Sequence, residues 1–324
     1  MLVRNKNVLL TGGAGFIGSH TAERLVKDGN FVIILDNMSS GRREFIEHIL
    51  GERAVLIIGD ASNEKVLSNL FSSYDIDVVF HMAANPDVRT SSMDTWSHVL
   101  NNFMTTYRIL EAMKEHSVQE ILFTSSSTVY GEASVIPTPE SYGPLKPISV
   151  YGATKLASEA LITSYAHNYG ITGAIFRFAN VIGPRSTHGV IYDFINKLRK
   201  NPRELEILGD GTQTKSYLYV DDCVEGMIFG FEKRKEDIEI FNLGSEDWIN
   251  VRRIAEIVVE EMGLSDVRFV FTGGIDGRGW KGDVKYMRLS IEKIKSYGWK
   301  PKYNSEEAVR LTARALIKEI IGEV

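Results

Sequence analysis

The chain has 324 residues, of which 44% are hydrophobic, and it carries a formal net charge of −5 at pH 7. This length can bury one large core or two linked cores without covalent cross-links, and the single cysteine, Cys223, excludes a disulfide framework or a thiolate metal cage. The basic residues are scattered, which argues against nucleic-acid binding. The sequence has no apolar run near the ~20 residues of a membrane span and no signal-peptide pattern after Met1, so we expect a cytoplasmic protein with no membrane partner.

In the first half of the chain, short apolar runs alternate with stretches of helical periodicity. Strands of a parallel sheet are buried on both faces and therefore read as continuous apolar runs. Right-handed crossovers between such strands give a doubly wound α/β sheet, the Rossmann arrangement. The predicted strands are 7–11, 31–35, 54–58, 77–80 and 120–124, and the predicted helices are 16–27, 63–73 and 94–116.

The second half is less regular. A long helix over 149–169 and a strand over 172–178 complete the first pattern, and the rest indicates a second, smaller α/β domain. We expect one domain over 1–178, with 218–242 returning to it, and the other over 179–217 and 243–324. The further predicted helices are 189–200, 221–234, 250–262 and 305–321, and the further strands are 205–208, 239–242 and 268–271.

A glycine-rich segment joins the first strand to the first helix. Gly12, Gly15 and Gly18 allow a tight turn, a close approach of the backbone to a pyrophosphate, and the positive end of a helix dipole beside it. Asp36, at the tip of the second strand, is placed to bind a ribose 2′-hydroxyl and to repel a 2′-phosphate. The segment therefore predicts a dinucleotide site, although a glycine-rich turn without a ligand gives the same letters.

Two details of this site leave alternatives open. Arg42 and Arg43 follow Asp36 closely and could accept the 2′-phosphate of NADP, but the carboxylate at the strand tip favours NAD. Asp60 closes the third strand, where it could accept a hydrogen bond from an adenine amine. It could equally cap the helix that begins near Asn63.

Tyr151 and Lys155 stand four residues apart on the predicted helix 149–169, so they share one face. A tyrosine that acts as a base needs its pKa lowered from about 10, and a nearby ammonium supplies much of that change. A Ser/Thr-rich segment, 124–131, ends the fifth strand, where open α/β sheets bind their ligands. Taken alone, the spacing of Tyr151 and Lys155 is a weak signal, because two ordinary residues of a helix surface can show it. The Ser/Thr-rich segment is also typical of a turn that hydrogen-bonds its own backbone.

Taken together, these segments are similar over essentially the whole length to the extended short-chain dehydrogenase/reductase family, and within it to nucleotide-sugar 4-epimerases of the UDP-glucose 4-epimerase type. The segments that carry the resemblance are residues 11–18, Asp36–Asn37, 81–84, Asn102, 125–131, 151–155 and 177–184. The resemblance implies tightly held NAD, a UDP-sugar substrate and a 4-keto intermediate in the interconversion of UDP-glucose and UDP-galactose or a related UDP-hexose. It also implies a role in galactose metabolism, and a homodimer formed through the helices at 94–116 and 151–169.

The resemblance also assigns residues. The catalytic residues are Ser126, Tyr151 and Lys155. The cofactor-binding residues are Gly12, Gly15, Phe16, Ile17, Gly18, Asp36, Asn37, Ser40, Gly41, Asp60, Ala61, Met82, Ala83, Ala84, Asn102, Thr124, Tyr151, Lys155 and Phe178. The substrate-binding residues are Ser126, Asn180, Ile207, Lys215, Val251, Arg278 and Asp283, with Lys215 and Arg278 on the diphosphate and Asp283 on the ribose.

The chain departs from the family pattern at several places. Ser127 and Thr128 stand where the related dehydratases and decarboxylases carry an acid, which argues against those reactions. Lys215 replaces an arginine, and a lysine binds phosphate as a point charge rather than through a fork. Ile207 and Val251 are assigned to the uracil pocket, but simple core packing explains them equally well.

Other functions remain as alternatives. A reductase or a 5-epimerase of the same family would share the fold, and a non-catalytic NAD-sensing protein would share the glycine loop. The presence of Ser126, Tyr151 and Lys155 argues against the last of these. None of the seven histidines has a metal-ligand spacing, so we expect no metal site, and we expect a structural role for His81.

Overall fold

The computed structural model describes residues 3–280 and 282–322. Contacts divide the chain into two compact units. The first contains 1–131, 145–177 and 224–241, and the second contains 132–144, 178–223 and 242–324. The segment 132–144 therefore groups with the second unit, where Asn242 donates its N–H to Glu140 over 2.8 Å. The sequence alone placed this segment, and residues 218–223, in the first domain.

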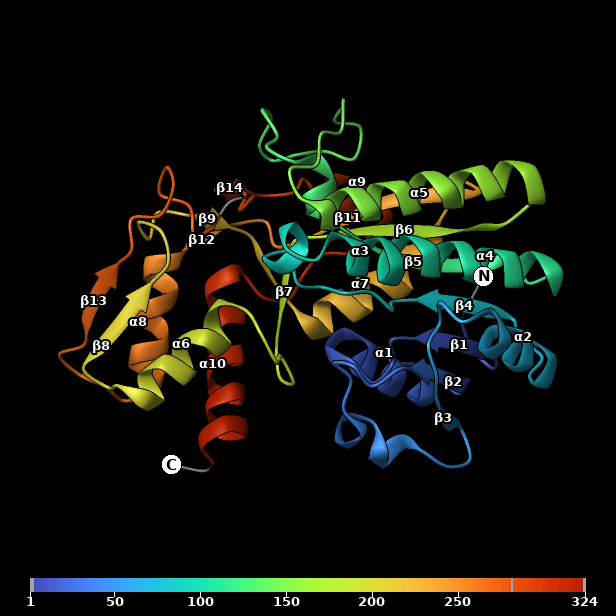
Figure 1. Ribbon diagram of the computed structural model, residues 1–324, viewed down its shortest axis with the longest axis horizontal. Coiled ribbons are helices and arrows are strands. Elements are labelled where there is room, and N and C mark those ends of the chain that lie inside the picture. The colour runs from blue at the N-terminus through green and yellow to red at the C-terminus, as the bar shows by residue number, and fades with distance from the viewer. Residues whose placement is uncertain (1–2, 281, 323–324) are drawn as a thin grey trace. The chain divides into compact units, whose positions relative to one another are not determined.

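A seven-stranded sheet forms the centre of the first unit (Figure 1), in the order β11-β6-β5-β4-β1-β2-β3. Strand β1 runs parallel to β2 and β4, β2 to β3, and β4 to β5. The strands are β1 Asn7–Thr11, β2 Phe31–Asp36, β3 Ala54–Ile58, β4 Val78–His81, β5 Glu120–Ser126, β6 Thr172–Phe178 and β11 Ile238–Leu243. The predicted doubly wound α/β fold is confirmed, and the chain reverses its winding between β1 and β4, where such sheets bind ligands.

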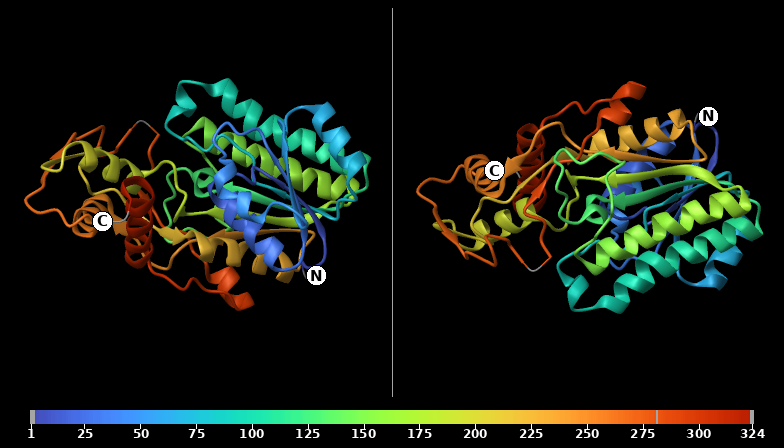
Figure 2. Two further views of the ribbon diagram at one scale, coloured as in Figure 1. Left: turned by 90° about the horizontal axis from the view of Figure 1, so that it is seen from below. Right: turned by 90° about the horizontal axis from the view of Figure 1, so that it is seen from above.

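Helices cover both faces of this sheet. Figure 2 shows α4 and α5 on one face and α1 and α7 on the other. Apolar side chains of α2, α4 and α5 pack against the inner strands in one continuous core, which includes Leu9, Val79 and Phe123. The helices are α1 Phe16–Lys27, α2 Glu64–Ser73, α3 Thr95–His98, α4 Thr105–Glu115, α5 Val150–Tyr169 and α7 Val220–Lys233.

The helix predicted over 94–116 is interrupted. Between α3 and α4 the backbone forms a π-helical segment, η4 Val99–Met104. The hydroxyl of Thr105 donates to the Leu100 carbonyl, five residues earlier, over 3.1 Å, and that of Thr106 donates to the Asn102 carbonyl over 2.7 Å. Both carbonyls also accept the backbone N–H of Thr105, so each threonine hydroxyl adds a second donor to a carbonyl of this wider turn.

The second unit contains small sheets of two or three strands and a group of three packed helices, α6 Val190–Lys200, α8 Val251–Glu261 and α10 Ser305–Ile321. Their apolar faces form a second core with β8 and β10. The sequence predicted neither the helix α9 Glu292–Tyr297 nor any of the two- and three-residue strands, because segments this short show no periodicity. The strands are β7 Asn180–Ile182, β8 Glu204–Ile207, β9 Thr214–Lys215, β10 Tyr217–Tyr219, β12 Ile249–Asn250, β13 Arg268–Phe271 and β14 Tyr286–Met287. Across the described ranges, no helix is long and apolar enough to span a membrane.

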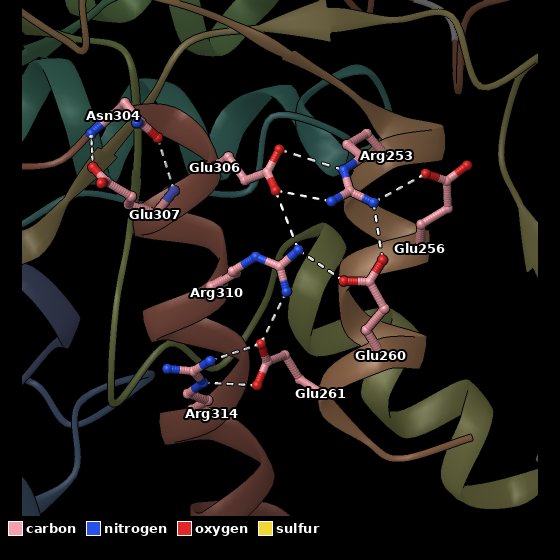
Figure 3. A network of polar contacts seen from close by, with 9 residues as sticks. All are labelled: Arg253, Glu256, Glu260, Glu261, Asn304, Glu306, Glu307, Arg310 and Arg314. Atoms are coloured by element: carbon pink, nitrogen blue, oxygen red, sulfur yellow. Dashed lines mark hydrogen bonds and ion pairs between the residues drawn. The ribbon is translucent and has the colours of Figure 1, made fainter. Parts of the chain in front are cut away.

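The polar faces of α8 and α10 are joined by a network of ion pairs (Figure 3). Arg253 contacts Glu260 over 2.9 Å and Glu306 over 2.8 Å, while Arg310 contacts Glu260 over 2.7 Å and Glu261 over 3.1 Å. A shared network strengthens surface pairs that would contribute little one by one.

We predict that Arg310→Met lowers the stability of the second unit by about 1 kcal/mol, because three carboxylates lose their shared cation. For a chain of this length, that corresponds to a fall in Tm of roughly 1–2 °C in low salt, and the difference should shrink in high salt. Arg252 is the control, because it contacts only Glu256 among the ion pairs of the described residues. Equal melting curves for Arg252→Met and Arg310→Met would contradict the network.

Candidate active site

The glycine loop of the first unit has no room for a side chain at Gly12 or at Gly18. Gly12 has a φ of 71°, and a Cβ there would lie 2.8 Å from the backbone nitrogen of Ala83. At Gly18 a Cβ would lie 2.1 Å from the Gly12 carbonyl oxygen. Gly15 is the N-cap of α1 and carries no side chain to bond the N–H groups of the first turn, which begins with Phe16 and Ile17. The loop therefore leaves backbone donors open to an anion.

Asp36 organises the loop from the end of β2. Its carboxylate accepts the N–H of Ala14 over 3.0 Å and that of Met38 over 2.8 Å. Burial raises the pKa of Asp36, and these two backbone donors oppose the rise. The segment that carries Ser40 and Gly41 folds back onto this carboxylate, since a Cβ at Gly41 would lie 2.7 Å from Asp36 Oδ1.

The structure separates the two hypotheses for Asp60. The side chain that caps α2 is Asn63, whose Oδ1 accepts the N–H of Lys65 over 3.0 Å, so Asp60 is not the cap. Asp60 instead accepts the N–H of Ser62 over 2.8 Å and lies 3.5 Å from Asn37 Nδ2. Burial acts to raise the pKa of Asp60, but these hydrogen bonds hold it below its ordinary value. Ala61 follows as a buried residue of the core.

At the end of β4, Thr11 of β1 accepts the N–H groups of Met82 and Ala83, both over 3.2 Å, and so shapes the turn that continues through Ala84. His81 is fully buried, with its two ring nitrogens 2.8 Å from Thr11 Oγ1 and 3.0 Å from Thr106 Oγ1. Burial lowers the pKa of His81 to about 3, so its imidazole is neutral. These contacts fit the structural role that we expected.

Asn102 is buried in the π-helical segment and uses its whole amide within the protein. Its Oδ1 accepts the N–H of Asn85 over 2.7 Å, and its Nδ2 donates to Thr154 Oγ1 over 3.1 Å. The residue therefore ties the turn after β4 to α5. The resemblance assigns Asn102 to the cofactor, whereas the contacts that the structure shows for it anchor this turn.

Lys155, Tyr151, Ser126 and Thr124 meet at the carboxyl end of β5. Lys155 donates from Nζ to the Thr124 carbonyl over 2.9 Å, and its Nζ lies 6.0 Å from the centre of the Tyr151 ring. Burial raises the pKa of Tyr151 to about 12, against a hydrogen bond with Ser126 that lowers it. Burial also lowers the pKa of Lys155 to about 7. Without further positive charge, the tyrosine is therefore a poor base.

A second aromatic side chain, which the sequence did not single out, stands beside Tyr151. The ring of His98 lies edge-on to the Tyr151 ring, with centres 6.2 Å apart. His98 is fully buried, and neither ring nitrogen has a hydrogen-bond partner within 3–280 and 282–322. Burial lowers the pKa of His98, while Asp87 and Asp94 act in the opposite direction.

The sequence reasoning also missed a buried charged cluster one turn beyond Lys155. Glu159 accepts from Arg177 Nη2 over 2.6 Å and from Nε over 3.0 Å, and it also accepts the hydroxyl of Ser125. Arg177 in turn donates to the Tyr130 hydroxyl over 2.9 Å. A signal was present, because Tyr151, Lys155 and Glu159 follow one another at intervals of four and so share a helix face.

In the second unit, Lys215 and Asp283 form an ion pair of 2.6 Å, and Asp283 is only 3% exposed. Arg278 donates to the Asp283 carbonyl over 2.6 Å and pairs with Glu132. Lys215 also lies over the ring of Trp280, 5.5 Å from its centre. The structure therefore gathers the three residues expected to form the clamp, with two partners that the sequence did not indicate. Lys281, between Trp280 and Asp283 in the sequence, lies outside the described residues.

The remaining predicted substrate residues have contacts of their own. Ile207 is fully buried in the second core and Val251 packs against that core, which fits the packing interpretation of both. Asn180 Nδ2 donates to the Ser216 carbonyl over 3.4 Å. Phe178, assigned to the cofactor, is 7% exposed and groups with the second unit.

Comparison with known proteins places this geometry in a family. Residues 8–244 match the family described as "NAD dependent epimerase/dehydratase family". A putative UDP-glucose 4-epimerase of Methanocaldococcus jannaschii is 35% identical over 94% of this chain and 96% of its own.

Solved structures agree. A crystal structure of a UDP-galactose 4-epimerase has a TM-score of 0.85 at 44% identity and covers 97% of this chain and 99% of its own. The UDP-glucuronic acid 4-epimerase of Bacillus cereus, solved with UDP-glucuronic acid and NAD, has a TM-score of 0.86 at 31% identity, with 97% and 99% covered. These relatives are UDP-sugar 4-epimerases, which are isomerases. The chain belongs to the NAD dependent epimerase/dehydratase family of the extended short-chain dehydrogenase/reductase group, as its sequence predicted.

Proposed function

We propose that this protein is an isomerase that inverts C4 of a UDP-hexose, with UDP-glucose and UDP-galactose as the first pair to test. The observation that carries the proposal is the meeting of Ser126, Tyr151 and Lys155 at the end of β5, on the same sheet edge as the glycine loop. Ser127 and Thr128, which follow in the Ser/Thr-rich segment, cannot supply the acid that a dehydratase requires.

The residues of the loop fit NAD. At Gly12 and Gly18 the backbone packs so closely on itself that a Cβ would clash, and this lets the chain turn tightly into the N-terminus of α1, whose first-turn N–H groups suit a pyrophosphate. We expect Asp36 to bind the ribose hydroxyls, and its negative charge would favour NAD over NADP. NAD bound in this loop would supply the hydride acceptor for C4 and, once reduced, the hydride donor to the opposite face of the sugar, so the reaction would have no net redox change.

Residues of this chain transfer the proton of the sugar 4-hydroxyl. Tyr151 accepts the proton of the sugar 4-hydroxyl, and Ser126 hydrogen-bonds that hydroxyl and orients it. Because burial holds the pKa of Tyr151 at about 12, the positive charge of Lys155 is needed to stabilise the phenolate. Tyr151 then returns the proton after the 4-keto sugar has turned over, which completes the inversion.

In the second unit, we assign Lys215 and Arg278 to the diphosphate of the substrate and Asp283 to its ribose. Each cation already has an anionic partner, Asp283 for Lys215 and Glu132 for Arg278. These partners hold the two side chains in place, and a diphosphate would compete with them for the positive charge. UDP-glucuronate is a second candidate substrate, because a structural relative binds UDP-glucuronic acid.

The decisive experiment is incubation of the purified protein with UDP-galactose without added NAD, with UDP-glucose as the readout. Turnover would establish 4-epimerisation by retained cofactor. Turnover of UDP-glucuronate or UDP-N-acetylgalactosamine alone would keep the mechanism and change the substrate. A reductase would require added reduced cofactor, a 5-epimerase would exchange the C5 hydrogen with solvent, and a sensor would bind NAD and convert none of these sugars.

We predict that Lys215→Gln raises KM for the UDP-sugar about tenfold and leaves kcat within about twofold. The lysine would contact the diphosphate, which is held equally in ground state and transition state, and a charge-assisted hydrogen bond contributes roughly 1.5–3 kcal/mol. Lys285→Gln is the matched control, because Lys285 also pairs with an aspartate, Asp210, over 3.2 Å. A fall in kcat with unchanged KM would contradict the assignment.

A further inference from the structure

The buried cluster of Ser125, Tyr130, Glu159 and Arg177 calls for an explanation, because its charges are almost fully removed from water. Arg177 is 3% exposed and Glu159 is 4% exposed. Removing each of two charges from water costs several kcal/mol. Well-packed apolar side chains in their place would often stabilise a fold at least as much as the ion pair does. A buried ion pair is therefore weak evidence for stability alone, and its position in the molecule is the better guide to its role.

This cluster connects the three elements that carry or support the catalytic residues. Glu159 lies one turn after Lys155 on α5, Ser125 adjoins both Thr124 and Ser126 on β5, and Arg177 stands on β6. Through Glu159, the hydroxyl of Ser125 and the guanidinium of Arg177 share a single carboxylate. We propose, on the basis of the proposed function, that Glu159 and Arg177 are positioning residues. Their ion pair fixes the end of β5 against α5 and holds a carboxylate one helical turn from Lys155.

The groups around Lys155 support this assignment. On β5, Lys155 contacts the Thr124 carbonyl and the ring of Phe123, 4.9 Å from its Nζ. On β4, the buried imidazole of His81 is neutral, because its pKa is lowered to about 3. Tyr151, on the same helix as Lys155, is neutral until it gives up its proton.

Glu159 is thus the negative charge that acts on Lys155. Burial lowers the pKa of Lys155 to about 7, and Glu159 opposes that fall. Arg177 orients this carboxylate through hydrogen bonds from two of its nitrogens. Loss of the carboxylate charge would lower the pKa of Lys155 further, so the lysine would lose its proton at a lower pH.

The test is Glu159→Gln, studied as the NAD-containing protein. Because an opposite charge at this range shifts a pKa by one unit or more, the alkaline limb of the kcat profile should move down by about one pH unit. The rate at pH 7 should then fall about fivefold, since the protonated fraction of Lys155 falls from about one half to about one tenth. In Glu159→Gln, Arg177 is left as an unpaired buried cation, which should lower Tm. The double variant Glu159→Gln/Arg177→Met removes that cation, so its Tm should return toward the wild-type value while the alkaline limb of its kcat profile stays at the lower pH.

A second readout does not depend on turnover. NMR titration of the Lys155 side chain, labelled with ¹³C and assigned with Lys155→Arg, should show the same downward shift in Glu159→Gln. Glu120→Gln is the control, because Glu120 pairs with Arg234 over 2.5 Å at the other end of β5 and should leave both readouts unchanged.

The outcomes are distinguishable. An unshifted Lys155 titration, or a wild-type alkaline limb in the double variant, would overturn the inference even in an active epimerase. A shifted titration in a protein that converts no UDP-sugar would support the link between Glu159 and Lys155 and would overturn the proposed function instead.

Discussion

Tyr151→Phe should lower kcat for 4-epimerisation about 10³-fold, with little change in KM. The variant keeps the ring and its packing against His98, but it removes the hydroxyl that takes the proton, and a positioned acid–base group contributes roughly 10²–10⁴-fold. The measurement is the steady-state conversion of UDP-galactose to UDP-glucose, together with the NAD content of the purified variant. Retained NAD would show that the loss lies in the proton transfer and not in cofactor binding.

Tyr165→Phe is the matched control for this variant. Tyr165 lies on the same helix, and its hydroxyl donates to Glu111 over 2.5 Å, so the substitution removes one hydrogen bond far from the proposed chemistry. We expect kcat within about twofold of the wild type, with a small loss of stability. If Tyr151→Phe and Tyr165→Phe were equally active, Tyr151 would not be the base.

The second large effect is expected for Gly18→Ala. The added Cβ would lie 2.1 Å from the Gly12 carbonyl oxygen and 2.8 Å from the Gly13 Cα, so the backbone of the loop must shift. Displacement of the loop removes the close approach that a pyrophosphate needs, and overpacking of this kind also costs about 1–3 kcal/mol of stability. We expect the purified variant to retain less than about one tenth of the NAD of the wild type, measured after release by denaturation.

Gly143→Ala controls for the loss of a glycine as such, because no described residue other than its two chain neighbours comes within 4 Å of a Cβ at that position. It should retain its NAD and its melting temperature. Full NAD content in Gly18→Ala, with an unchanged Tm, would mean that the loop is not the pyrophosphate site. A lowered Tm with full NAD content would restrict the role of Gly18 to packing between the turns of the loop.

Much of the fold and part of the site could be predicted from local patterns. Continuous apolar runs such as 31–35 predicted buried parallel strands, because both faces of those strands are covered by helices. Gly12, Gly15 and Gly18 predicted the loop because few other residues allow so close a backbone approach. The spacing of Tyr151 and Lys155 placed both on one helix face because a helix repeats every 3.6 residues.

Other predictions from pattern were limited by tertiary context. The periodicity over 94–116 indicated one helix. In the structure, a π-helical segment over Val99–Met104 interrupts it, and the hydroxyls of Thr105 and Thr106 donate to carbonyls of this wider turn. Periodicity also could not show that Asn63, rather than Asp60, caps α2, because both residues stand near the start of that helix.

The sequence by itself determined the family, the sheet and the glycine loop, because each depends on residues that are neighbours along one strand, turn or helix. Only the tertiary structure joined Glu159 of α5 to Arg177 of β6 and Ser125 of β5, and Lys215 to Asp283, 68 positions further along the chain. It likewise decided that burial, rather than Lys155, dominates the pKa of Tyr151. Desolvation and pairing depend on what surrounds a side chain in space, and those neighbours come from distant segments that no local pattern brings together.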